Sequence, residues 1–325
     1  MNWTRGAGAK PVRIVPKKRK AAGSGAAPGR WRVQGSPSRI SRRRVLALAA
    51  GSSLAAIAAR RAWAAEAEPI RFALTPVLLT NDLDLLDKLR LALEAATESP
   101  VQIVTRRTYQ EITALLVSGQ VDGAWICGSP FVAYRQLLEL LAVPVWLGRP
   151  LYQSYLIADA GRNAVSIEAL AGDIHAFSDP DSNSGYLVTA AELAGKRYKP
   201  ERYFRQVFFT YGHRNVVRAV ASGLAQSGSV DGYVYEVLRE VEPALIDATA
   251  VVRRSDWFGF PPIACSSATV GTERTEKLRI ALLTMHESDI GRQALAALRL
   301  DAFSAEPASL FEPVAANLAL VRGLG

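Results

Sequence analysis

The sequence predicts an α/β fold with two lobes, and three observations support this prediction. Short apolar stretches alternate with segments that carry leucines at helical spacing in residues 69–142. A second alternating series fills residues 174–240. Between them, residues 143–159 form strand on strand, the kind of extended passage that can carry a chain from one lobe to another. We therefore expect two lobes, each a mostly parallel sheet flanked by helices, with a cleft between them.

The expected elements of the first lobe follow in strand and helix order. Strands are predicted at residues 69–76, 101–107 and 121–128, and helices at residues 81–99, 108–120 and 129–141. Asn81 or Asp82 is a plausible cap for the first helix. Thr108 and Glu111 have the spacing of a capping box, and Ser129 before Pro130 is typical of a helix start.

The second lobe repeats this order, and the chain then returns to the first. Strands are predicted at residues 174–178 and 205–212, helices at 184–195 and 213–223, a strand turning into a helix at 230–240, an extended stretch at 258–270, and two final helices at 275–288 and 290–300. We expect residues 69–152 and 255–325 to form lobe 1, and residues 153–254 to form lobe 2.

The net charge of +9 belongs to the N-terminal leader and not to the folded body. Residues 1–64 hold fifteen of the 39 Lys and Arg residues and no acidic residue, which leaves 24 basic against all 30 acidic residues in the remainder. A body of net charge −6 repels nucleic acid rather than attracting it. The sequence therefore argues against a nucleic-acid partner.

The leader has the order of an export signal. Basic residues 42–44 precede a weakly apolar run at 45–59, and small residues follow at 62–64. The paired arginines followed by Leu46 resemble a twin-arginine signal. The apolar run is shorter than the roughly 20 residues that a membrane span requires. We expect cleavage after Ala64 and export to the periplasm, and we assign no structure to residues 1–37.

A dense polar segment precedes one of the predicted helices. Ser182, Asn183 and Ser184 supply side-chain donors, and Gly185 lets a ligand approach the backbone. A helix N-terminus presents unpaired N–H groups and the positive end of the helix dipole. Hydroxyl groups placed there can join those amides in holding an anion, so the segment predicts an oxyanion site.

Four segments together resemble a known family. RTYQEITALLVSGQVDGAWICGSPFVAY, FSDPDSNSGYLVTAAEL, YGHRNVVRAVASG and VDGYVYEVL are similar, in order and spacing, to the phosphate, phosphite and phosphonate-binding proteins of ABC transporters. The most specific element is Asp-Pro-x-Ser-x-Ser-Gly-Tyr before a helix. The resemblance covers most of residues 69–290. It implies a two-lobed type II periplasmic binding protein that captures a phosphate-like oxyanion or a phosphonate for a membrane permease.

The resemblance also implies further ligand-binding residues. The family has a histidine that faces the ligand where His213 stands, and it offers an aromatic hydroxyl and a second helix start at the positions of Tyr109, Gly128 and Ser129. Tyr155, on the crossover strand, is an additional candidate.

This chain also departs from the family pattern. Arg214 stands where the family commonly has an aspartate, and the family acid after the following strand corresponds to Glu236. These changes leave the exact ligand open.

Cysteines and catalytic motifs leave some alternatives open. Cys127 and Cys265 could be small buried residues or a disulfide pair, and Cys127 beside Gly128 could be a thiol ligand for arsenite, as in arsenite-sensing relatives of the same superfamily. No metalloprotease, nucleophile-elbow, phosphate-loop or CxxC motif is present, so we expect no enzyme, no cofactor and no metal. The alternatives are a sensory binding protein that signals to a membrane histidine kinase and, less favoured, a periplasmic enzyme that processes anions.

Overall fold

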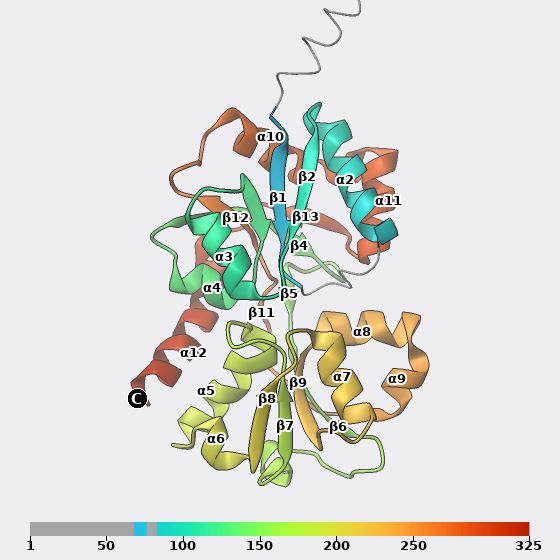
Figure 1. Cartoon of the computed structure of the whole chain (residues 1–325), viewed down its shortest axis with the longest axis vertical. Helices are drawn as coiled ribbons and strands as arrows, with labels where there is room; N and C mark the ends of the chain where they lie inside the picture. The colour runs from blue at the N-terminus through green and yellow to red at the C-terminus, as the bar shows by residue number, and fades with distance from the viewer. Residues whose placement is uncertain (1–67, 77–82, 325) are drawn as a thin grey trace, which may run out of the picture. The chain divides into compact units, whose positions relative to one another are not determined.

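The computed structural model describes residues 68–76 and 83–324 (Figure 1). The predicted export signal and the predicted helix caps Asn81 and Asp82 lie outside these residues. Within the described part of the chain, no helix is long and apolar enough to cross a membrane.

The first sheet has six strands in the order β13, β4, β12, β3, β1, β2. Their bounds are Ile70–Leu74 for β1, Val101–Thr105 for β2, Gly123–Trp125 for β3, Leu138–Val145 for β4, Ile263–Ser266 for β12 and Ala302–Ser304 for β13. Strand β1 runs parallel to β2 and β3, whereas β12 runs antiparallel to β3 and β4, and β13 antiparallel to β4.

The second sheet has five strands in the order β10, β6, β9, β7, β8. Their bounds are Ser154–Asp159 for β6, Ile174–Phe177 for β7, Gln206–Phe209 for β8, Ser227–Asp231 for β9 and Thr249–Arg254 for β10. Strand β7 is parallel to β8 and β9, while β6 is antiparallel to β9 and β10.

Each sheet is therefore mixed, where the sequence predicted mostly parallel pairing. The strands that alternate with helices along the chain pair in parallel, as expected. The strands that run opposite to these are β6, which the chain enters when it first crosses to the second sheet, and β12 and β13, which it enters after its return to the first. The chain enters these strands from the opposite end of the sheet. The α/β class and the two-lobed architecture are confirmed.

The helices of the first lobe, the one that contains the six-stranded sheet, flank that sheet. They are α2 (Leu83–Thr97), α3 (Tyr109–Val117), α4 (Gly128–Ala133), α10 (Glu273–Leu283) and α11 (Asp289–Leu298). Helices α2 and α11 pack against each other on one side of the sheet, and α3 and α4 lie on the other side (Figure 1). The capping box of Thr108 and Glu111 is confirmed, with the two residues bonded to each other's backbone.

The helix predicted over residues 129–141 is wrong in its second half. Helix α4 ends at Ala133, and Leu138 already belongs to strand β4. A short run of leucines fits a buried helix or a buried strand equally well. Pairing of residues 138–142 with β12 decides for the strand, and β13 pairs with its later residues 143–145.

The helices of the second part lie on both sides of the five-stranded sheet (Figure 1). They are η2 (Asn183–Leu187, a π-helix) continuing into α5 (Val188–Gly195), then α6 (Pro200–Tyr203), α7 (His213–Ala221), α8 (Gly232–Val241) and α9 (Pro243–Asp247). The described residues also form three short 3₁₀ helices: η1 (Ile167–Leu170), η3 (Met285–Glu287) and η4 (Ala308–Phe311).

Three further elements join the two lobes. Strand β5 (Leu151–Tyr152) pairs with β11 (Phe258–Gly259) where the chain passes between the two sheets. Helix α12 (Glu312–Gly323), which the sequence analysis did not predict, contacts α4 on one side and α5 and η2 on the other. The Phe311 ring, just before α12, lies edge-on to Phe131 of α4 with centroids 5.0 Å apart.

Candidate functional site

A buried polar cluster lies at strand ends and helix starts of both sheets. Its members are each at most 2% exposed: Tyr109, Cys127, Asp179, Ser182, Asn183, Ser184, His213 and Asp231. Tyr109 opens α3 and Cys127 follows β3, whereas Asp179 follows β7, His213 opens α7 and Asp231 ends β9. Buried polar groups of this density require mutual hydrogen bonds or a ligand.

The polar segment predicted from the sequence forms one wall of this cluster. The Ser182 Oγ accepts the Gly185 N–H at 3.0 Å, which caps the helix formed by η2 and α5. The Ser184 carbonyl accepts a hydrogen bond from the Ser154 Oγ at 2.6 Å. The structure therefore places Ser182, Asn183, Ser184 and Gly185 together at a helix N-terminus, where N–H groups favour an anion.

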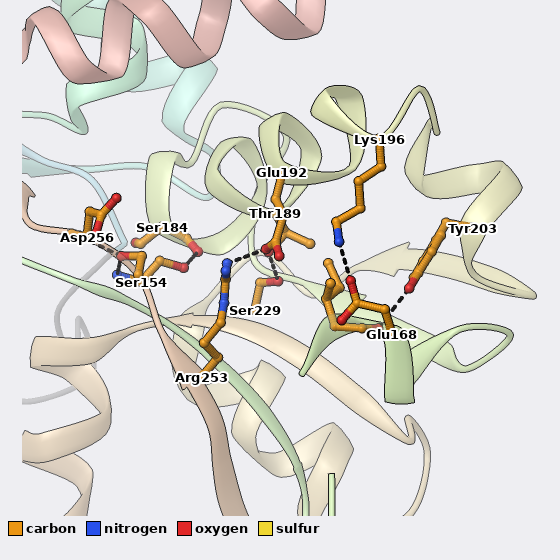
Figure 2. Close-up of polar contacts among 12 residues, drawn as sticks. Ser154, Glu168, Ser184, Thr189, Glu192, Lys196, Tyr203, Ser229, Arg253 and Asp256 are labelled. Atoms are coloured by element: carbon orange, nitrogen blue, oxygen red, sulfur yellow. Dashed lines mark hydrogen bonds and ion pairs between the residues drawn. The ribbon is translucent and has the colours of Figure 1, made fainter. Parts of the chain in front are cut away.

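Side chains along the same helix fix it to the sheet, as Figure 2 shows. Thr189 and Ser229 of β9 share a hydrogen bond of 2.7 Å. Glu192 forms an ion pair with Arg253 of β10. With the Ser154 contact from β6, three strands hold this helix along its length, so its N-terminus is positioned by a rigid scaffold.

Gly185 is required at its position by close packing. A Cβ atom on this residue would lie 1.8 Å from the Ser178 Oγ, 2.7 Å from the Ser178 Cβ and 2.9 Å from the His213 Cε1. Only glycine allows the helix start, the β7 end and the histidine ring to approach this closely.

A chain of hydrogen bonds fixes the proton of His213. The backbone N–H of Asp231 donates to Nδ1 at 3.1 Å, so this nitrogen is the acceptor and the ring proton lies on Nε2. The Nε2–H then donates to the Tyr109 hydroxyl oxygen at 3.2 Å, which leaves the hydroxyl proton free for another acceptor. Burial holds the His213 pKa at about 3, so the ring is neutral at physiological pH.

Two carboxyl groups, which the sequence analysis did not select, belong to the cluster. Asp231 caps α8 through the N–H groups of Tyr233 and Val234 and accepts the Ser184 hydroxyl at 3.3 Å. Burial raises its pKa to about 7. Asp179 accepts the Tyr109 N–H at 3.3 Å, and burial raises its pKa as well. The position of each at the end of a strand was the signal that could have identified them.

Cys127 and Asn183 join the two parts of the cluster. The Asn183 N–H donates to the Cys127 Sγ at 3.1 Å, and the Asn183 Nδ2 contacts the Tyr152 hydroxyl at 3.0 Å. Both cysteines of the chain are free and buried, so the disulfide considered from the sequence is absent. Burial raises the pKa of Cys127 to about 11, so the group is a neutral thiol.

Gly128 and Ser129 open helix α4 directly after Cys127, and both are buried. Tyr155 and Glu236, in contrast, are not brought into the cluster. The Tyr155 hydroxyl donates to the Glu236 carboxylate at 3.1 Å, and the Arg254 guanidinium lies over the Tyr155 ring. Successive residues of a strand point to opposite faces, so Ser154 reaches the helix start while Tyr155 faces away from it.

Arg214, where the family commonly has an aspartate, also points elsewhere. Its Nε lies 2.5 Å from the Glu242 carboxylate. The buried polar cluster thus has no Lys or Arg member, and its donors are hydroxyl, imidazole and backbone N–H groups. Among the described residues, no group of three His, Cys, Asp or Glu side chains could hold a metal ion.

Comparison with known proteins identifies the family. Residues 72–309 match the model for the phosphonate-binding periplasmic substrate-binding proteins of ABC transporters. The binding protein component of an ABC phosphonate transporter from Pseudomonas aeruginosa has a similar structure, with a TM-score of 0.73 and 20% identity over 80% of this chain and 88% of that one.

Two further structures share the fold. PhnD1 from Prochlorococcus marinus, in complex with methylphosphonate, gives a TM-score of 0.69 with 15% identity over 78% of this chain and 97% of that one. XAC2383 from Xanthomonas citri, bound to ATP, gives 0.63 with 15% identity over 78% and 97%. The family match covers more than half of the sequence, and the chain therefore belongs to the phosphonate-binding family of periplasmic substrate-binding proteins of ABC transporters.

Proposed function

We propose that the chain captures a phosphonate or a phosphate-like oxyanion in the buried polar cluster and presents it to the permease of an ABC importer. The observation that carries this proposal is the helix N-terminus at Ser182, whose Asn183 N–H lies 3.1 Å from the Cys127 Sγ of the first lobe. The Tyr109 N–H of the same lobe donates to Asp179, just before this helix, at 3.3 Å. A tetrahedral oxyanion held there would bridge both lobes. Binding would then favour a closed arrangement, as a hinge motion requires.

The donors and acceptors of the cluster fit an oxyanion that still carries a proton. The hydroxyl groups of Ser182, Ser184 and Tyr109 can donate to anionic oxygens, and the Tyr109 proton is free because its oxygen already accepts the His213 Nε2–H. Asp231 and Asp179 can accept from an acidic P–OH group. Because two carboxyl groups and no cation line the cluster, an ion without a proton, such as sulfate, has no proton to donate to these groups and is repelled when they are ionised.

A titration of the full chain tests this proposal. Calorimetry with methylphosphonate, phosphite, phosphate and sulfate should give binding of the phosphorus compounds and none of sulfate. Replacing Ser182 by Ala should weaken binding at least about tenfold, because a donor to a charged group is lost.

Ser288→Ala is the matched control for Ser182→Ala. Ser288 caps α11 in the same way, with its Oγ accepting the Gly291 N–H at 3.0 Å. Each variant should lose about 1 kcal/mol of helix capping. Only Ser182→Ala should lose affinity, and equal affinity of the two variants would refute the site.

We further propose export by the twin-arginine route, since the family functions in the periplasm. The motif lies in the run Arg42, Arg43 and Arg44 of the leader. Replacing all three with Lys should retain the unprocessed chain in the cytoplasm, which fractionation and immunoblotting would detect. Unchanged processing of this variant would exclude the route.

A further inference from the structure

We propose that Cys127 contacts the ligand and lies on a surface that separates from the other lobe when the lobes open. Without ligand its Sγ accepts the Asn183 N–H, and in the complex a ligand oxygen takes the place of the Sγ as the acceptor. This inference rests on the proposed function, which gives the cluster its ligand. It assigns a role in oxyanion binding to a residue that the sequence analysis considered only as a buried residue, a disulfide partner or an arsenite ligand.

The first observation is the contact itself. The Asn183 N–H belongs to the first residue of the η2 helix, where backbone donors lack helical partners. It points to the Cys127 Sγ at 3.1 Å. A neutral thiol is a weak acceptor, and the thiol stays neutral because burial raises its pKa. An anionic oxygen is a much stronger acceptor and would displace it.

The second observation points to a ligand independently of the cysteine. The Asn183 side chain is fully buried, and its Oδ1 has no hydrogen-bond partner among the described residues. An unpaired buried amide oxygen is costly and uncommon in a folded protein. The Tyr152 hydroxyl can donate as well as accept, so the amide can present either of its atoms to a ligand.

Both observations concern Asn183. The backbone of Asn183 is held by a weak acceptor and its side chain has unused hydrogen-bonding capacity, so both are suited to exchange partners. Cys127 belongs to the segment after β3 of the first sheet, and Asn183 to the segment after β7 of the second. A ligand that bridges the lobes would therefore lie against the thiol, and the thiol would meet solvent when the lobes part.

The two free thiols provide an internal comparison. Cys265 lies within β12, which is hydrogen-bonded on both sides by β3 and β4. A reagent reaches it only after the sheet unfolds, whereas Cys127 needs only the opening of contacts between the lobes. In the full chain without ligand, Cys265→Ala, which retains Cys127, should react with methyl methanethiosulfonate at least about 100-fold faster than Cys127→Ala, which retains Cys265.

Ligand should then protect Cys127 from the reagent. Methylphosphonate at 100 times its Kd should slow modification of the Cys265→Ala variant about 100-fold, since the reagent reacts with the ligand-free form only. The Cys127→Ala variant should also react more slowly with ligand, because Cys265 reacts only from the unfolded state and ligand disfavours that state, so the rates without ligand are what distinguish the two thiols. Prior modification of Cys127 should abolish binding in calorimetry. Cys127→Ala should bind several-fold more tightly, because the ligand no longer competes with the thiol for the Asn183 N–H.

The outcomes separate this inference from the proposed function. Equal rates for the two thiols in the ligand-free protein would show that Cys127 does not lie on a parting surface and would overturn the inference. Binding in calorimetry without protection, or weaker binding by Cys127→Ala, would retain the proposed function and also overturn the inference. Absence of binding by every phosphorus compound would remove the proposed function, and with it the ligand contact.

Discussion

Replacing Gly185 by alanine tests the packing on which the candidate site depends. The added methyl group would lie 1.8 Å from the Ser178 Oγ and 2.7 Å from the Ser178 Cβ. Rotation about the Ser178 side chain can move the Oγ, but the Cβ is fixed to the backbone of the segment after β7. The backbone must therefore shift by several tenths of an ångström.

The same methyl group would lie 2.9 Å from the His213 Cε1, so the ring must also move. Overpacking of this kind costs about 1–3 kcal/mol, which lowers Tm by about 2–12 °C in a chain of this size. Displacing the ring should break the alignment of its Nε2–H and weaken ligand binding at least about tenfold.

Gly195→Ala is the matched control, in the last residue of α5. Apart from its chain neighbours and the backbone of its own helix, no heavy atom lies within 4 Å of the position of its Cβ, so the substitution meets open space. It should leave affinity unchanged and alter stability by no more than about 1 kcal/mol. Thermal unfolding by circular dichroism and calorimetric titration measure both quantities. A Gly185→Ala variant that matches wild type in Tm and affinity would refute the packing argument.

Three further predictions concern protons and the residues outside the cluster. Affinity for a given oxyanion should fall as pH rises through about 7, because Asp231 ionises there. Asp231→Asn, which keeps the helix cap, should remove that part of the fall, and an equal dependence of affinity on pH in the two proteins would contradict this. His175, neutral between Ser227 and Ser229 with a pKa of about 3, should contribute stability that is lost as pH falls below about 6.5, and His175→Gln should flatten the urea-unfolding free energy over that range by up to about 1.4 kcal/mol per pH unit. Glu236→Gln should change affinity by less than about twofold in calorimetry, and a larger loss would bring that carboxylate into the site.

The sign of the acid effect follows from the direction of each pKa. A histidine whose folded pKa lies below its unfolded value binds fewer protons in the native state, so stability rises with pH between about 3 and 6.5. Asp231 has the opposite sign, because its folded pKa of about 7 makes the native state bind more protons between about 4 and 7. In acid, the two buried histidines therefore favour unfolding, whereas Asp231 and Asp179, whose pKa values are raised, oppose it.

Local patterns in the sequence determined the α/β class, the order of most strands and helices, and the family. The capping box at Thr108 was predictable because it involves residues three apart. The polar segment at Ser182 to Gly185 was predictable as a helix start, because a cluster of hydroxyl and amide residues before an apolar period has few other local explanations. These features depend on neighbours in the chain.

Long-range contacts decided the rest. Residues 138–141 became strand rather than helix because strand β12, more than 120 residues later in the sequence, pairs with them. Asp231 and Asp179 entered the cluster, and Glu236 did not, because strand ends and strand faces, which no local pattern fixes, determine where a side chain points. The tautomer of His213 and the partner of Cys127 each depend on a residue at least 18 positions away in sequence, so only the tertiary structure could set them.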